Sequence, residues 1–225
     1  MRKIGTLAIV CFSSGLTLVI VAAVATVLGT LGKVPLGDYR GVTVATGILV
    51  ATYVFAFLAY RIFLHCFPLK PGFIEEGSRD EQVAHVNILC YLILFNSLTR
   101  THFIPVPIMR LAYLALGAKL GENTYCAGTL LDPPLTRMGK NCIVGHNAVL
   151  YAHTIEGRYF ALEPIVIGDN VTIGAMATVM SGVVIGDGAI VSAGAVVRKG
   201  TVIGAGETWG GVPARLLKPA AGDPA

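Results

Sequence analysis

Two histidines with carboxylates nearby are the residues best suited to chemistry. His146 and His153 lie seven positions apart, and the sequence around the second reads LYAHTIEG. An imidazole titrates close to working pH, so it can take a proton from an attacking hydroxyl or amine. Such a base often needs a carboxylate that fixes its tautomer, and Asp132 and Glu156 are the candidates for that role. We expect general-base chemistry, with His153 as the base and His146 as the alternative base or a substrate-positioning residue.

Large apolar residues recur every six positions in the C-terminal half, and this repeat must position the histidines. The main series is Ile167, Ile173, Val179, Ile185, Val191, Val197, Ile203 and Trp209. An earlier block has the same step: Leu120, Cys126, Asp132, Met138, Val144 and Leu150. A period of six fits neither the α-helix nor the heptad. It predicts a three-sided solenoid of short parallel strands, with one large side chain of every six pointing inward and glycine at corners where a Cβ would clash.

The repeat is interrupted once, next to His153. Leu150 and Ile167 are 17 residues apart, which is not a multiple of six, so a loop should leave the prism at about 155–164. Loops that interrupt a regular scaffold often carry function. His153 follows the inward Leu150 by three positions, and His146 follows an inward valine by two, so both should point outward.

Asp132 occupies a position of the six-residue series that should be apolar. It lies 18 residues, one full coil, before Leu150. A buried carboxylate needs a compensating partner. It is either the partner of the catalytic base or the cap of a turn forced by Pro133 and Pro134, and the sequence leaves both readings open.

The N-terminal half is too apolar to face water throughout. Charged residues make up 13% of the chain, against about 25% in a typical soluble domain. The segments Ile4–Gly32 and Gly41–Tyr60 carry no charge, and each is long enough for a membrane-spanning helix of ~20 residues. They predict an α-helical transmembrane hairpin. Basic residues outside the hairpin outnumber Lys33 and Arg40 in its connection, so both termini should be cytoplasmic.

Two further apolar stretches follow the hairpin, at Val86–Leu98 and Phe103–Leu116. The first is too short to span comfortably, and two prolines interrupt the second. We expect interfacial helices that pack against the anchor. A buried soluble helix pair explains the same pattern, and a third span, which would place the C-terminal domain outside, remains an alternative. The expected domains are an anchor at 1–66, a helical linker at 67–118, a β-helix at 119–217 and a disordered tail at 218–225.

The run from Ile167 to Leu217 resembles the hexapeptide-repeat acyltransferases, and GGVPAR is similar to the element that closes their repeats. The resemblance covers about residues 116–217. It implies a mainly β fold, a left-handed parallel β-helix, and a homotrimer with active sites between neighbouring prisms. In related sugar and antibiotic acetyltransferases the base lies just before the extruded loop, where this chain has His153. Relatives often carry an asparagine near Thr129, and this chain does not.

The resemblance also implies an acyl-CoA co-substrate, acetyl-CoA or a longer acyl-CoA, in a groove beside the coils. Candidate contacts are the backbone of one corner, a second outward corner and cations for the phosphates. These residues are Gly174, Ala175, Ala177, Ser192, Ala193, Gly194, Arg198, Lys199 and Arg215. Trp209 is expected to plug the end of the prism.

Two other classes of protein fit parts of the sequence. VGHNAVL is similar to the γ-class carbonic anhydrases, but Tyr151 stands where their second histidine should be, so no metal site is expected. A non-catalytic trimeric membrane scaffold explains the repeats but not the loop beside His153. The net charge of +4, without basic runs, does not indicate nucleic acid.

The sequence as a whole predicts a membrane-associated O- or N-acyltransferase. Its acceptor would be a hydroxyl or amine close to the bilayer, on a lipid-linked sugar, a polysaccharide precursor or a lipid. The expected location is the bacterial inner membrane, with the catalytic domain on the cytoplasmic side.

Overall fold

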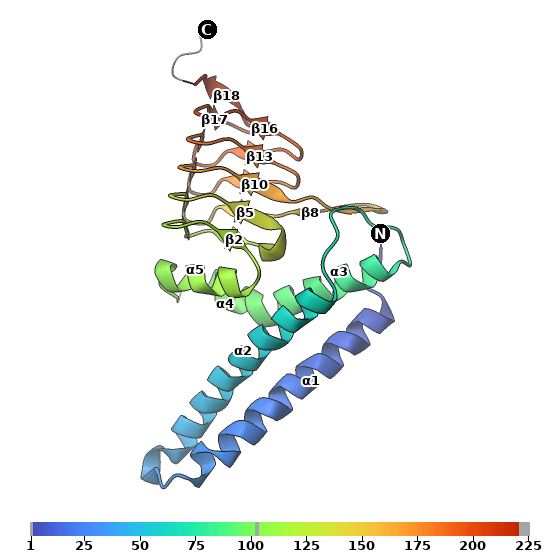
Figure 1. The fold of residues 1–225 in the computed structure, drawn as a ribbon, viewed down its shortest axis with the longest axis vertical. Helices are drawn as coiled ribbons and strands as arrows, with labels where there is room; N and C mark the ends of the chain where they lie inside the picture. Colours follow the sequence, from blue (N-terminus) through green and yellow to red (C-terminus); the bar gives the residue numbers. More distant parts are fainter. Residues whose placement is uncertain (1, 102–103, 221–225) are drawn as a thin grey trace.

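The computed structural model describes residues 2–101 and 104–220, with helices in the N-terminal half and a β-helix in the C-terminal half. Figure 1 shows α1 and α2 as an antiparallel hairpin that projects away from the β-helix, with α3 crossing its near end. The helical elements are α1 (Thr6–Gly29), η1 (Leu31–Lys33), η2 (Gly37–Tyr39), α2 (Arg40–Cys66), α3 (Arg79–Leu89), the π-helical η3 (Cys90–Phe95), α4 (Asn96–Arg100) and α5 (Val106–Ala115).

Among the described residues, three helical runs are long and apolar enough to cross a membrane, judged by length and composition: Thr6–Lys33, Gly37–Cys66 and Arg79–Arg100. The first two form the expected hairpin. Many of its large apolar side chains point away from the protein, and Leu18 is 70% exposed, Val42 71% and Ile62 64%. Such a surface is unfavourable in water because the hydrophobic effect scales with exposed apolar area.

The third run is longer than the sequence pattern predicts. The apolar stretch Val86–Leu98 lies inside a 22-residue helical run from Arg79 to Arg100, which is long enough to span, and the interfacial position expected for the stretch stays a prediction. Polar residues extend the helix at its start: the Ser78 hydroxyl accepts a hydrogen bond from the backbone N–H of Glu81 at 3.1 Å and caps the first turn. Further along, the ring of Phe95 lies 4.9 Å from that of Phe57 in α2, so the run packs across the hairpin.

Helix α5 closes the lower end of the β-helix. The Arg110 side chain donates hydrogen bonds to the backbone oxygens of Thr124, Leu120 and Gly121 at 3.1, 3.5 and 3.0 Å. These carbonyls belong to the first coil, which has no coil below it to bond with, and buried carbonyls require partners. Phe103, at the start of the predicted second stretch, lies outside the described residues.

The β-helix is a three-sided stack of short strands. Its strands are β2 (Lys119–Leu120), β3 (Tyr125–Cys126), β4 (Thr129–Leu130), β5 (Thr136–Met138), β6 (Ile143–Val144), β7 (Val149–Leu150), β10 (Ile165–Ile167), β11 (Thr172–Ile173), β12 (Thr178–Val179), β13 (Val184–Ile185), β14 (Ile190–Val191), β15 (Val196–Val197), β16 (Val202–Ile203) and β17 (Thr208–Gly210), with η4 (Pro133–Leu135) between β4 and β5. They form the parallel faces β2-β5-β10-β13-β16, β3-β6-β11-β14-β17 and β4-β7-β12-β15. This arrangement fits a left-handed β-helix.

The register of the strands shows where the chain departs from a regular coil. Ile167 pairs with Ile185, so that coil has 18 residues, whereas Met138 pairs with Ile167, a step of 29. The 11 extra residues form the predicted loop, which is an antiparallel hairpin of β8 (His153–Glu156) and β9 (Tyr159–Leu162). A third strand, β1 (Gly72–Phe73), pairs antiparallel with β9. Figure 1 shows β8 extending away from the prism toward the N-terminus.

The C-terminal tail begins later than predicted. Lys218 belongs to β18 (Arg215–Lys218), which pairs antiparallel with β17 and covers the last coil. This pairing gives partners to backbone groups that the final strand edge would otherwise leave unpaired. Residues 221–225 of the predicted disordered tail lie outside the described residues.

Two kinds of residue form the corners, and the sequence pattern identified only one of them. A Cβ added to Gly186 would lie 2.6 Å from the backbone nitrogen of Ala205 in the next coil, which confirms the close-approach role predicted for these glycines. A second series has left-handed backbone conformation every six residues, with φ of 57° at Asn170, 59° at Met176 and 68° at Gly182. Glycine and asparagine adopt this conformation at low cost.

Substituting a close-approach glycine should destabilise the β-helix. We expect Gly186→Ala to lower the free energy of unfolding by about 3 kcal/mol, because the neighbouring coil must shift to admit the methyl group. Gly200→Ala is the matched control: φ is 67° and the added Cβ meets nothing within 4 Å, so only backbone strain of about 1 kcal/mol remains. Thermal unfolding of the two variants measures the difference, and equal losses would contradict the packing argument.

Candidate active site

His153 and Asp132 form a hydrogen-bonded pair where the β8–β9 hairpin leaves the prism. Nδ1 of His153 lies 2.7 Å from Oδ2 of Asp132. The same oxygen accepts the backbone N–H groups of Ala152 at 2.7 Å and His153 at 3.2 Å. The Asp132 side chain is 3% exposed and that of His153 is 28% exposed. Three donors therefore hold a buried carboxylate against an imidazole that remains open on one side.

Asp132 reaches His153 because the repeat shifts by two residues in its coil. The sequence pattern placed Asp132 at the inward position below Leu150, but the structure pairs Leu130 with Leu150 instead. This part of the prediction is wrong. The chain then makes a 3-10 turn at Pro133–Leu135, which takes up the two extra residues, and the backbone oxygen of Asp132 accepts the hydroxyl of Thr136 at 3.0 Å. Asp132 is thus outside the inward series and turns toward His153.

The carboxylate sets the state of the imidazole. Burial by itself lowers the pKa of His153, but the hydrogen bond to Asp132 and its negative charge outweigh burial and raise the pKa above its ordinary value. When the ring is neutral, Nδ1 carries the proton that it donates to Asp132, and the lone pair is on Nε2. This is the tautomer that a general base needs.

Polar contacts hold the start of the hairpin on the prism. The Thr154 and Ser181 hydroxyls are hydrogen-bonded to each other, and the Ser181 hydroxyl donates to Glu163 Oε2 at 3.0 Å. The backbone N–H of Glu163 donates to the carbonyl of Ala152 at 2.7 Å. The backbone on both sides of His153 is therefore fixed to the neighbouring coil.

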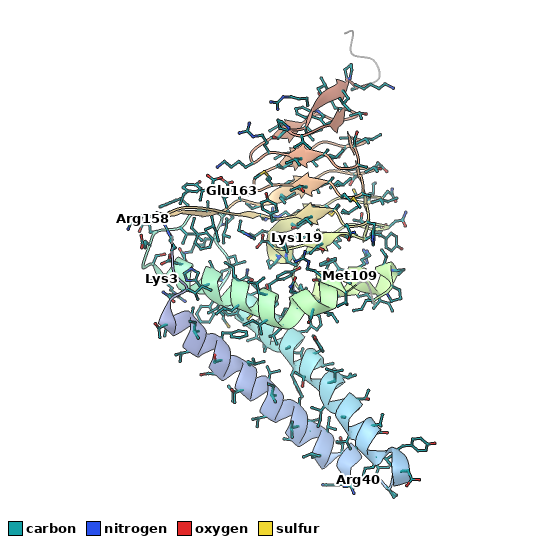
Figure 2. All side chains as sticks on the ribbon, turned by 180° about the vertical axis from the view of Figure 1, so that it is seen from behind. Lys3, Arg40, Met109, Lys119, Arg158 and Glu163 are labelled. Atoms are coloured by element: carbon teal, nitrogen blue, oxygen red, sulfur yellow. The ribbon has the colours of Figure 1, made fainter. Side chains whose placement is uncertain are left out.

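The far end of the hairpin is bound to the beginning of the chain. Arg2 forms an ion pair with Glu81 at 3.1 Å, both side chains being almost fully buried, and its Nε donates to the backbone oxygen of Arg158 at 2.8 Å. Arg158 in turn contacts Glu76 at 2.8 Å. Figure 2 shows Arg158 at the hairpin above Lys3 at the start of the helical part. These contacts tie the strand that carries His153 to α1 and α3.

A pocket of about 300 Å³ opens beside His153, between the β8–β9 hairpin and the helical run of α3, η3 and α4. One wall carries Asp132, His153, Ile155 and Leu131 from the β-helix. The opposite wall consists of Asn87, Ile88, Tyr91, Leu92, Asn96 and Arg100. The sequence analysis missed this helical wall, because its residues follow the helix period and nothing in the six-residue repeat refers to them. The wall contains the π-helical turn Cys90–Phe95, a structural feature that often marks functional sites but that the sequence pattern does not reveal.

The other two candidates for the acid–base chemistry lie elsewhere. Glu156 points to Lys199, whose Nζ lies 2.8 and 2.7 Å from its two carboxylate oxygens. The structure thus brings Asp132 rather than Glu156 to His153. His146 is exposed at a corner of the prism, where its backbone oxygen accepts the N–H of Met176 at 2.9 Å.

The candidate CoA contacts fall into two groups on different edges of the prism. Ala175 stacks between His146 and Gly194: Met176 bonds back to His146, and the N–H of Gly194 donates to the carbonyl of Ala175 at 2.8 Å. Gly174, Ser192 and Ala193 belong to the same stacked corners. Ala177 is fully buried, and its N–H and carbonyl bond to Gly174 and Val149, so within this chain it has a structural role.

The cationic candidates lie apart from this edge. Arg198 and Lys199 form an exposed corner next to the hairpin, where the N–H of Gly200 donates to the carbonyl of Ser181 at 2.9 Å. Arg215 is exposed on β18 at the end of the prism. Trp209 is partly buried against the core in the last coil, where its Nε1 donates to Glu207 at 2.7 Å.

No metal centre is built in residues 2–101 and 104–220: no three histidine, cysteine, aspartate or glutamate side chains lie close enough together to hold an ion. His153 and Asp132 instead form a hydrogen-bonded pair. As a pair they can accept a proton at the imidazole and return it.

Comparison with solved structures identifies similar folds. A hexapeptide-repeat acetyltransferase from Vibrio cholerae is 26% identical, with 46% of this chain and 63% of that one covered and a TM-score of 0.43. The same protein complexed with acetyl coenzyme A gives 19% identity, 71% and 98% coverage and a TM-score of 0.51. A galactoside acetyltransferase in complex with coenzyme A gives 18% identity, 71% and 90% coverage and a TM-score of 0.49. A search of curated proteins finds no match.

A comparison with family models agrees with the architecture. Residues 164–199 match the family described as bacterial transferase hexapeptide (six repeats). These residues follow the β8–β9 hairpin directly and contain strands β10 to β15, two on each face of the prism. Residues 164–199 therefore carry a hexapeptide repeat similar to that of the bacterial hexapeptide transferases.

Proposed function

We propose that this protein is a membrane-bound acyltransferase that moves an acyl group from acyl-CoA to a hydroxyl or amine, with His153 as the general base. The observation that carries the proposal is the contact between Asp132 and His153 at the mouth of a pocket on a hexapeptide-repeat β-helix. The match of residues 164–199 to the bacterial transferase hexapeptide family supports a transferase, and the similar structure complexed with acetyl coenzyme A supports the acyl-CoA donor. Acetyl-CoA is the proposed donor, and titration with acetyl-CoA and a long-chain acyl-CoA measures which acyl chain length the protein prefers.

The proposed reaction needs one proton shuttle. Nε2 of His153 takes the proton from the acceptor as its oxygen or nitrogen attacks the thioester carbonyl, and Asp132 stabilises the imidazolium that forms. The tetrahedral intermediate then collapses, the carbon–sulfur bond breaks, and the CoA thiolate leaves. The imidazolium returns its proton to the thiolate, so the base is ready for another cycle.

The proposal places the reaction at a bilayer. The outward apolar side chains of α1 and α2 support insertion of the hairpin as an anchor, and the helical run Arg79–Arg100 lies between that anchor and the pocket. In the proposed orientation both termini and the β-helix are on the cytoplasmic face of a bacterial inner membrane, where acyl-CoA is available. The acceptor is then close to the membrane, as a lipid-linked sugar, a polysaccharide precursor or a lipid would be.

A homotrimer is part of the proposal because the residues of the expected site lie on two different edges of a single chain. His153 lies on the hairpin edge, whereas the stacked corners of Ala175 and Gly194 lie on another edge of the prism. Packing of prisms side by side would bring the corner edge of one chain to the hairpin edge of the next. Each of three equivalent sites would then combine residues of two chains.

Calorimetric titration of acetyl-CoA into the detergent-purified trimer tests the donor. We expect saturable binding by the wild type and by His153→Ala, because the imidazole acts on the acceptor and contributes little to binding the nucleotide. Arg198→Gln should bind more weakly if this exposed corner contacts the phosphates. Failure of both acetyl-CoA and a long-chain acyl-CoA to bind the wild-type protein would overturn the proposed function.

A further inference from the structure

The helical wall of the pocket contains a buried polar atom that lacks a partner. Oδ1 of Asn96 has almost no solvent contact, and no described residue gives it a hydrogen bond. Asn96 lines the pocket that also contains His153. A buried acceptor left unsatisfied destabilises a protein, so such an atom needs an explanation. A ligand in the pocket that donates a hydrogen bond supplies one when the Asn96 amide turns its oxygen toward the pocket.

Two neighbouring polar groups on this wall, the Tyr91 hydroxyl and Asn87 Oδ1, already have partners within the protein. The Tyr91 hydroxyl is 3.0 Å from that of Thr99, and Asn87 Oδ1 accepts the Tyr60 hydroxyl at 2.6 Å. Asp132 is engaged by His153 and by two backbone N–H groups. Asn96 Oδ1 is thus the acceptor on this wall that a ligand can use without breaking a bond of the fold.

The rest of the pocket is mainly apolar. Leu131 and Ile155 from the β-helix face Ile88 and Leu92 from the helical run, and Leu92 and Ile155 are 53% and 47% exposed. The opposite face of the same helical run is apolar too: Val86, Cys90 and Leu94 line a second pocket against α1 and α2. The wall of the site is therefore formed by the helix that packs on the proposed membrane anchor.

We infer that this pocket binds an amphiphilic acceptor, a membrane lipid whose hydroxyl or amine reacts at His153 while its hydrocarbon chain lies along Ile88, Leu92 and Ile155. The reacting group, or a neighbouring hydroxyl of the same head, donates a hydrogen bond to Asn96 Oδ1. The acyl chain of the donor is the alternative occupant. It offers no hydrogen-bond donor, so it leaves Asn96 unsatisfied and explains only the apolar part of the pocket.

This inference rests on the proposed function and names the acceptor class for its site. A binding experiment tests it without turnover. The probe is a sixteen-carbon alcohol with a photoreactive diazirine in its chain, cross-linked to the trimer in nanodiscs and mapped by peptide mass spectrometry. We expect labelling of the segments that contain Leu92 and Ile155, and competition by an unlabelled long-chain alcohol but not by methanol.

Asn96→Leu removes the acceptor atom while keeping a similar volume. We expect the variant to reduce pocket labelling by about 10-fold, which is the effect of losing one hydrogen bond to a buried group. Ser97→Ala is the matched control on the same helix: its hydroxyl is exposed and bonds to the Leu94 carbonyl, so labelling should not change. Acetyl-CoA affinity should be equal in the wild type and both variants, which shows that the fold is retained.

The outcomes separate the two proposals. Equal labelling of Asn96→Leu and wild type, or labelling confined to the outer faces of α1 and α2, overturns the amphiphile site. Labelling of the pocket by a photoreactive palmitoyl-CoA, with none by the alcohol, assigns the pocket to the donor chain and also overturns it. If the wild type binds neither acetyl-CoA nor a long-chain acyl-CoA, the proposed function itself fails, whatever the alcohol labels.

Discussion

Replacing His153 by glutamine should reduce kcat for acyl transfer by about 10²- to 10⁴-fold, the usual contribution of a general base. Glutamine is similar in size to histidine, and its amide can donate a hydrogen bond to the Asp132 carboxylate, although from one bond further along the side chain than Nδ1. It cannot accept and return a proton. Release of CoA thiol from acetyl-CoA, measured with an acceptor present, checks the result.

His146→Gln is the control for this substitution. His146 is exposed on another corner of the prism and does not line the pocket that contains His153 and Asp132. We therefore expect its substitution to change kcat less than about 10-fold, with any effect in KM. A loss of kcat in His146→Gln that matches the loss in His153→Gln would show that His153 is not the sole base.

Replacing Asp132 by asparagine should reduce kcat by about 10³-fold and change the pH dependence. The asparagine oxygen can still accept the backbone N–H groups of Ala152 and His153, so the turn should survive. Its neutral amide no longer fixes the tautomer of the imidazole or stabilises the imidazolium. Because Asp132 raises the pKa of His153, the variant should have a lower pKa, and the acid limb of kcat/KM should move to lower pH.

The same contact between Asp132 and His153 makes the free energy of unfolding depend on pH. The raised pKa of His153 means that its protonated form is favoured in the folded protein, so the contribution is fully present below the unfolded pKa of about 6.5. It is lost as the pH rises through the folded pKa. Thermal unfolding should therefore separate wild type and Asp132→Asn more at pH 6 than at pH 9.

Asp187→Asn is the matched control for the aspartate. Oδ1 of Asp187 accepts the backbone N–H of Asp169 at 2.8 Å, in a corner remote from the β8–β9 hairpin. Like Asp132, Asp187 thus holds a backbone N–H group, but it contacts no histidine in doing so. We expect a modest loss of stability and an unchanged pH profile. An acid limb that stays in place in Asp132→Asn, or that shifts equally in Asp187→Asn, would contradict the role assigned to Asp132.

Much of the fold is predictable because the β-helix repeats its packing in every coil. Ile173, Val191 and Val197 each face the same environment, so the requirement for one large inward side chain appears in the sequence as a period of six. The length of the interruption after Leu150 located the hairpin for the same reason. The helical hairpin was predictable from the lengths of its uncharged segments.

The parts that were missed depend on contacts that are distant in sequence. The choice between Asp132 and Glu156 required knowing that Leu130 takes the inward position, a two-residue shift that depends on how the turn at Pro133 packs. Asn96 carries no local signal, since its importance comes from facing a strand more than fifty residues away in the chain. The ion pair of Arg2 with Glu81 likewise joins segments that no repeat relates.

The position of the thioester in a bound complex tests the central claim most directly. The measurement is a structure of the protein in a membrane mimetic with acetyl-CoA bound. We predict that the thioester carbonyl carbon lies within about 6 Å of Nε2 of His153, which leaves room for one acceptor atom between base and carbonyl. A thioester held at another edge of the prism, out of reach of His153, would contradict the account.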